Sequence, residues 1–182
     1  MLQLEIPERE LFDEKSLTFI TLKKEFLQLE HSLISLSKWE STWKKPFLSK
    51  EEKSNEETID YIKCMTITQN VKSDVYMYLS SDTMDIIKKY IEDPMTATWF
   101  SDKTFPHAQN IRETITAELI YYWMIALQIP FECQKWHLNR LLTLIRVCNI
   151  KNQPPKKQSR KEMMANRTAL NNARRAHYNT RG

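Results

Sequence analysis

Glycine is nearly absent from this chain: of its 182 residues one is glycine, and it is Gly182. An average usage of about 7% would supply roughly 13 glycines. Loops that cradle phosphate groups need glycine, because their backbone amides must approach the ligand without an obstructing Cβ atom. The sequence therefore excludes a Walker loop, a dinucleotide-binding turn, a kinase loop and a nucleophile elbow of the usual type. Since tight turns of sheet-rich folds also use glycine, we expect helices joined by Ser, Asn, Asp and Pro.

Hydrophobic periodicity predicts an α+β fold that is predominantly helical. Residues 2–6 alternate apolar and polar side chains, and residues 16–22 and 26–30 are also strand-like, so we expect a small N-terminal sheet of two or three strands. From residue 33 onward, apolar residues recur at helical spacing, with capping signals at Ser32 and in the pair Ser54 and Glu57. Two strongly apolar helices, 111–128 and 131–149, are expected to form a central hairpin.

Charge divides the chain into two parts. Residues 151–182 hold nine Lys or Arg and one acid, whereas residues 1–150 hold 18 bases and 22 acids. We therefore expect a mostly helical body over 1–150 and a basic arm over 151–182 that is disordered or folds on a partner. The arm residues expected to bind a partner are Lys156, Lys157, Arg160, Lys161, Arg167, Arg174 and Arg175. An acidic protein surface, nucleic acid and plain solvation of the arm all remain open.

Reactive side chains form no catalytic or metal-binding motif. Cys133 and His137 stand four residues apart and would share a helix face, but no second pair of ligands accompanies them, so packing is favoured over a metal site or a nucleophile. Glu113, Glu118 and Glu132 lie near the apolar helices, where ion pairs are a simpler account than acid–base chemistry. We therefore expect no catalytic residues, no metal and no cofactor.

Aromatic side chains are the other candidates for contact with a partner. Trp39 and Trp43 stand four residues apart on one expected helix face, where they either pack on the sheet or anchor another chain. Trp99 and Phe100 lie in an expected loop, residues 96–110. Because exposed loops rarely hold several large aromatics, this loop is expected either to fold back on the core or to form a contact surface.

Targeting signals are not evident in the sequence. No run of about 18 apolar residues occurs, and the mean hydropathy is -0.56, so we expect no membrane span. No charged segment followed by an apolar one opens the chain, so we expect no secretion signal. Three cysteines without a CxxC pair favour a reducing compartment over a disulfide framework.

Several segments of the chain carry a resemblance to a known family. They are residues 29–40, Trp43, 45–48, 60–66, 93–98 and, as the longest, residues 122–148, which read YWMIALQIPFECQKWHLNRLLTLIRVC. These segments resemble tail assembly chaperones of long-tailed bacteriophages. The resemblance covers most of residues 26–150. It implies a non-enzymatic protein of the host cytoplasm that binds the tape measure protein and helps tail tube subunits assemble around it. The family carries no catalytic or metal motif, so no site residues transfer from it.

A virion structural protein has nearly the same sequence requirements. It would be a head, connector or tail component whose basic arm contacts neighbouring subunits or DNA, and it would remain in the virion. Self-association and binding to nucleic acid stay open under both hypotheses.

Overall fold

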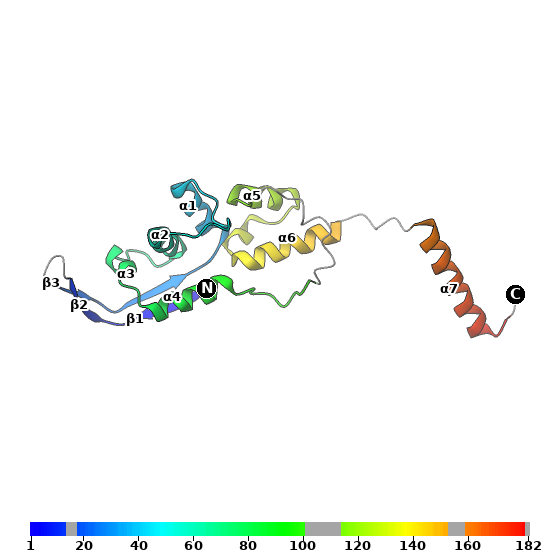
Figure 1. Ribbon diagram of the computed structural model, residues 1–182, viewed down its shortest axis with the longest axis horizontal. Coiled ribbons are helices and arrows are strands. Elements are labelled where there is room, and N and C mark those ends of the chain that lie inside the picture. The colour runs from blue at the N-terminus through cyan, green and yellow to red at the C-terminus, as the bar shows by residue number, and fades with distance from the viewer. Residues whose placement is uncertain (14–17, 101–113, 153–158, 181–182) are drawn as a thin grey trace. The chain divides into compact units, whose positions relative to one another are not determined.

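The computed structural model describes residues 1–13, 18–100, 114–152 and 159–180 of the chain. Helices predominate in these residues, and the N-terminal strands form two small antiparallel sheets of two strands each (Figure 1). The predicted fold class, α+β and predominantly helical, is confirmed. The chain divides into two units, Met1–Asn149 and Ile150–Gly182. No helix among the described residues has the length and apolar character needed to cross a membrane.

The N-terminal strands pair antiparallel in two short ladders. The strands are β1 (Leu2–Ile6), β2 (Arg9–Asp13), β3 (Thr18–Leu22) and β4 (Glu25–Leu29). β1 pairs with β4, and β2 pairs with β3. Leu4 and Leu27 face each other in the core while their neighbours along each strand are exposed, as the alternating pattern predicted. The prediction missed β2, because Leu11 and Phe12 are adjacent in it and give no alternation.

The helices of the described residues are seven α-helices and one 3-10 helix. They are α1 (Leu33–Trp43), α2 (Asn55–Met65), α3 (Ser73–Met77), α4 (Ser81–Glu92), α5 (Ala117–Ala126), the 3-10 helix η2 (Phe131–Lys135), α6 (Leu138–Asn152) and α7 (Arg160–Tyr178). α1 contacts α2, α5 and η2, and α4 contacts β1. Helix α1 therefore joins the N-terminal half of the body to its C-terminal half.

Two apolar cores lie on either side of α1. The first contains Leu4, Ile6, Leu27, Leu29, Trp39, Tyr61, Ile62, Met65, Val75, Tyr76, Ile87 and Tyr90. The second contains Leu33, Leu36, Ala117, Ile120, Met124, Ile129, Cys133, Leu138, Leu141 and Ile145. α1 supplies Trp39 to the first and Leu33 and Leu36 to the second. α1 thus contributes to both cores, whereas the described part of the expected central hairpin, residues 114–149, contributes buried residues only to the second.

The two C-terminal helices of the body are shorter than their apolar patterns predicted. α5 begins at Ala117, where the Thr116 side chain accepts a hydrogen bond from the Leu119 amide and caps the helix. The helix predicted from residue 131 to 149 is broken at Trp136, whose backbone is extended. An antiparallel bridge between Ser32 and His137 holds the chain out of the helix there. Tertiary pairing thus overrides local helical periodicity.

Helix α2 begins with the capping box that the sequence predicted. The Ser54 hydroxyl accepts a hydrogen bond from the Glu57 amide at 3.2 Å, and Glu57 Oε2 accepts one from the Ser54 amide at 2.8 Å. Each side chain therefore satisfies an amide that the first helical turn leaves without a partner.

Replacing Ser54 with alanine is expected to lower the free energy of unfolding by about 1 kcal/mol, because the Glu57 amide loses its acceptor. Urea unfolding followed by circular dichroism measures this. Ser73→Ala is the matched control, since Ser73 is exposed and begins α3 without serving as its cap. It should change stability by less than about 0.5 kcal/mol. Equal losses in both variants would contradict the capping account.

Candidate functional site

His31 and His137 form a buried pair that the sequence did not predict. His31 lies between β4 and α1, and His137 immediately precedes α6. The Leu138 amide donates to the His31 carbonyl at 2.7 Å, and the two ring centroids are 5.1 Å apart. The expectation that Cys133 and His137 share a helix face was wrong, because Cys133 lies in the 3-10 helix η2 and the backbone at Trp136 between them is extended. The two histidines are far apart in the sequence, so no local residue spacing could have predicted that they pair.

Each histidine ring is held by a hydrogen bond to a different helix. His31 Nδ1 lies 2.5 Å from the Tyr61 hydroxyl of α2. His137 Nε2 lies 2.9 Å from the Tyr90 carbonyl oxygen of α4, and because a carbonyl only accepts, Nε2 carries the proton. In the neutral ring His137 Nδ1 is then unprotonated, and it is buried with no hydrogen-bond partner among the described residues. The Tyr90 hydroxyl in turn donates to Glu30 Oε1 at 2.7 Å.

Burial makes the protonated form of both rings unfavourable. It lowers the pKa of His31 from 6.5 to about 3, with repulsion from His137 as the second cause. Burial also lowers the pKa of His137, although the hydrogen bond to the Tyr90 carbonyl opposes this shift. Both rings are neutral at pH 7, and their exposed fractions are 2% and 6%. The pair is a packed junction between the two halves of the body, closed to substrates.

Acidification is expected to destabilise the body through His31. The unfolded ring takes up a proton near pH 6.5 and the folded ring near pH 3, so the unfolded state binds more protons between these values. Stability is therefore fully present above pH 6.5 and falls as the pH is lowered toward 3. The loss from pH 7 to pH 5 should be about 2 kcal/mol, measured by urea unfolding at each pH. His31→Gln does not titrate and should flatten the profile; an equally steep profile would assign the dependence to other groups.

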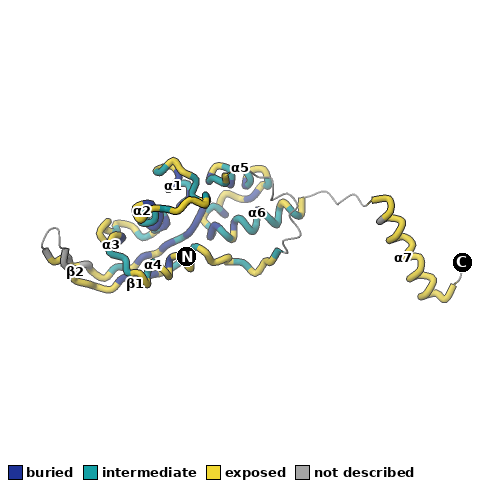
Figure 2. Tube along the Cα trace, viewed as in Figure 1, coloured by how far each residue is buried: buried dark blue, intermediate teal, exposed yellow. Residues whose placement is uncertain are grey.

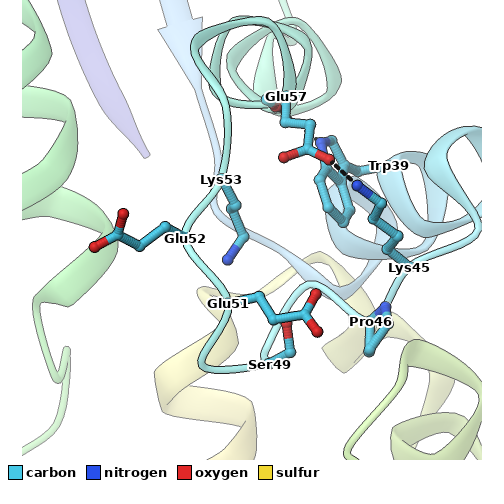
Figure 3. Close-up of a pocket in the computed structure, with 8 residues that line it drawn as sticks. All are labelled: Trp39, Lys45, Pro46, Ser49, Glu51, Glu52, Lys53 and Glu57. Carbon is cyan, nitrogen blue, oxygen red and sulfur yellow. Dashed lines mark hydrogen bonds and ion pairs between the residues drawn. The ribbon is translucent and has the colours of Figure 1, made fainter.

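A second polar cluster ties the loop after α1 to the start of α2 (Figure 3). Lys45 Nζ lies 2.7 Å from Glu57 Oε1, and Trp39 Nε1 donates to the Glu57 carbonyl at 2.9 Å. The hydrogen bond from Lys45 lowers the pKa of Glu57, and the same contact raises the pKa of Lys45. The hollow beside these residues measures about 20 Å³, room for about one water molecule. This cluster fixes the loop and leaves no space for a ligand.

An apolar groove lies between α2 and α4. Its volume is about 420 Å³. It is lined by Phe47, Lys53, Thr58, Tyr61, Ile62, Met84, Asp85, Ile87, Lys88, Ile91 and Glu92. Apolar side chains form most of this lining, and Asp85, Lys88 and Glu92 are exposed charges of α4. Such a lining accepts apolar side chains of a partner and surrounds them with charges of both signs.

Sequence reasoning did not identify the groove, although part of its signal was visible. Met84, Ile87 and Ile91 recur at helical spacing in α4, which predicts one apolar face. The spacing of these apolar residues does not show whether α2 covers the whole apolar face of α4 or only part of it. Phe47 comes from the loop after α1, and Lys53 Nζ lies 4.5 Å from the centre of its ring. That contact depends on how the loop folds, which the sequence pattern does not give.

The four aromatic candidates differ in how far their side chains are buried. Trp39 is 1% exposed and lies in the first core, so it packs inside the body rather than contacting a partner. Trp43 is partly buried, stacks on Trp39 with ring centroids 6.2 Å apart, and donates from Nε1 to Asp60 Oδ2 at 2.9 Å. Phe100 is partly buried. Trp99 is 90% exposed, so its ring lies open to solvent.

The contact of Phe100 is with α6. The Arg146 guanidinium carbon lies 4.0 Å from the centre of the Phe100 ring, a cation–π geometry. The end of the loop segment described here therefore folds back on the body, while Trp99 beside it faces solvent. The rest of the expected loop, residues 101–110, lies outside the described residues.

The basic arm contains a single long helix. Of the residues predicted to bind a partner, Lys156 and Lys157 lie outside the described residues. The others, Arg160, Lys161, Arg167, Arg174 and Arg175, all lie on α7 and are exposed. Figure 2 shows α7 exposed along its length. Residues 160–178 of the arm are thus helical, and none of the arm residues whose burial is described is buried.

Removing residues 153–182 is expected to leave the body folded. No described side chain of this segment is buried, so little apolar area is lost with it. The melting temperature of the truncated chain should lie within about 2 °C of the full-length value, measured by calorimetry. A drop of more than about 5 °C would mean that the segment contributes to the stability of the body.

The remaining reactive candidates are placed for packing or solvent contact. Glu118 and Glu132 are exposed, and Glu113 lies outside the described residues. Burial raises the pKa of the Cys64 and Cys133 thiols, which disfavours the reactive thiolate. Within the described ranges, no group of three or more His, Cys, Asp or Glu side chains is arranged to hold a metal ion. No protein-family model, curated protein or solved structure matches the chain.

Proposed function

We propose that the chain is a non-enzymatic tail assembly chaperone of a long-tailed bacteriophage, which binds the tape measure protein and helps the tail tube assemble around it. The observation that carries the proposal is the open apolar groove between α2 and α4. The resemblance of residues 26–150 to such chaperones supplies the identity of the client.

The lining of the groove supports a protein client. Its floor contains Tyr61, Ile62 and Ile87, all buried, while Met84 and Ile91 are partly exposed at its sides. An amphipathic helix buries an apolar face of this kind and leaves its charged residues at the rim. The rim provides Lys88 together with acidic side chains of the same helix, so it can pair with either sign of charge on the client.

Co-expression with the tape measure protein of the same tail tests the proposal. A tagged full-length chain should retain the tape measure protein on an affinity column. Ile91→Glu places a charge in the groove and should reduce the retained amount by at least about tenfold. Ile86→Glu is the matched control, because Ile86 is 46% exposed on the same helix and does not line the groove. Circular dichroism melts establish that both variants are folded. Equal retention by both variants, or no retention by the wild type, would overturn the proposal.

Mass spectrometry of purified particles separates the chaperone from a virion structural protein. A chaperone acts during assembly and should be absent from mature particles or present in trace amounts. Copies in the number expected of a head, connector or tail subunit would instead support the structural alternative.

A further inference from the structure

Arginine recurs at every seventh residue of α7. Arg160, Arg167 and Arg174 occupy equivalent positions in three successive stretches of seven residues. Seven residues are nearly two turns of an α-helix, so these side chains line up on one face about 10.5 Å apart. The row drifts by only about 20° from each arginine to the next. The face therefore presents a straight line of positive charge along the helix.

Apolar residues lie between the first two arginines. Arg160, Met163, Met164 and Arg167 line a shallow hollow on α7. Residues at these spacings, i, i+3, i+4 and i+7, are the four that form a hole for a side chain of a second helix in knobs-into-holes packing. The same spacing places Leu170 and Asn171 between Arg167 and Arg174. The holes thus repeat with the arginines.

The apolar floor of these holes is exposed to solvent. The exposed fractions are 53% for Met163, 62% for Met164 and 53% for Leu170. Covering such side chains with another apolar surface releases free energy, whereas a phosphate backbone would bring charge against them. A second protein helix therefore fits this face better than nucleic acid does.

Charge determines what kind of helix fits. Residues 160–178 contain five Lys or Arg and one acid, and three of those bases form the row. A second copy of α7 would bring arginines against arginines if it packed in the antiparallel direction, which like-charge repulsion disfavours. A helix with carboxylates opposite the arginines and apolar side chains over the holes is complementary in both respects.

We propose that this face of α7, the arginine row (Arg160, Met163, Met164, Arg167, Leu170 and Arg174), docks an acidic amphipathic α-helix of a protein partner. The identification of that partner as the tape measure protein rests on the proposed function. The chemistry of the partner rests on the row itself.

A designed acidic helix tests the chemistry directly. The probe is a fluorescent peptide of about 20 residues with glutamate at every seventh position and leucine three and four residues after each glutamate. Its binding to the full-length chain is followed by anisotropy. The double variant R167E/R174E should bind it at least about tenfold more weakly than wild type does, because it sets like charges against the peptide.

A second double variant distinguishes binding at the arginine row from general electrostatic attraction to the basic helix. K161E/R175E changes the net charge by the same amount but alters residues off the row, and it should weaken binding by less than about threefold. Equal losses in the two double variants, or no binding of the peptide to wild type, would overturn the proposal. Tighter binding of a DNA duplex of about 20 base pairs than of the peptide would also overturn it, in favour of phosphate recognition.

The tape measure protein then provides the link to the proposed function. If wild type binds the acidic peptide but does not retain the tape measure protein, the row stands and the proposed client is wrong. If R167E/R174E loses the peptide but retains the tape measure protein as well as wild type does, the client stands and the row is not its site.

Discussion

Replacing Glu40 with alanine should destabilise the body by about 4 kcal/mol, one of the two largest effects that the structure predicts for a single substitution. The Glu40 side chain is buried in α1. Its Oε1 accepts from the Phe47 amide at 2.8 Å, and its Oε2 accepts from the Ala117 amide at 2.7 Å. One carboxylate thus fixes the loop after α1 and the first residue of α5. Alanine would leave both amides without an acceptor.

Glu40→Gln provides the control for this effect. The glutamine oxygen can accept from one amide, but its NH2 group would face the other donor, so the loss should be about 2 kcal/mol. Urea unfolding of both variants measures the difference. A loss below about 1 kcal/mol for Glu40→Ala would show that water replaces the carboxylate at little cost and that Glu40 does not join the two halves of the body.

Replacing Trp39 with alanine should cost about 4 kcal/mol, because a fully buried aromatic side chain leaves a cavity that the body cannot close. The Trp39 ring contacts Trp43, Phe47 and Tyr61, with the Phe47 centroid 5.0 Å away in an edge-on arrangement. Its Nε1 also donates to the Glu57 carbonyl at 2.9 Å, which anchors the first turn of α2. The substitution therefore removes packing and a hydrogen bond together.

Two further variants separate the parts of the Trp39 effect. Trp39→Phe keeps most of the ring but loses the donor, and its expected cost is about 1.5 kcal/mol. Trp99→Ala removes the same residue type from a position that is 90% exposed, and should change stability by less than about 0.5 kcal/mol. Thermal or urea unfolding gives all three values. Similar losses at positions 39 and 99 would contradict the assignment of Trp39 to the core.

Local signals in the sequence predicted much of the fold. The alternation in residues 2–6 predicted β1, and Ser32 and Ser54 marked the starts of α1 and α2. These signals work because a cap or a strand pattern involves residues only a few positions apart. The basic charge of the residues that form α7 was also visible in the sequence, because it depends on composition alone.

Long-range contacts account for what the sequence did not predict. The break before His137 follows from a bridge to Ser32, and the buried histidine pair follows from that bridge. The Ala117 amide donates to Glu40, and no local sequence pattern links these two residues. The groove between α2 and α4 depends on where the loop carrying Phe47 lies. Each of these requires the packed body, so periodicity alone could not give them.

Suppression of client aggregation would show whether the chain, as proposed, holds a protein client through its apolar groove. Light scattering of the tape measure protein should be followed on dilution from denaturant, with and without the full-length chain. An equimolar amount of wild type should abolish most of the scattering, Ile86→Glu should do the same, and Ile91→Glu should not. Undiminished scattering with wild type, or equal protection by both variants, would contradict the proposal.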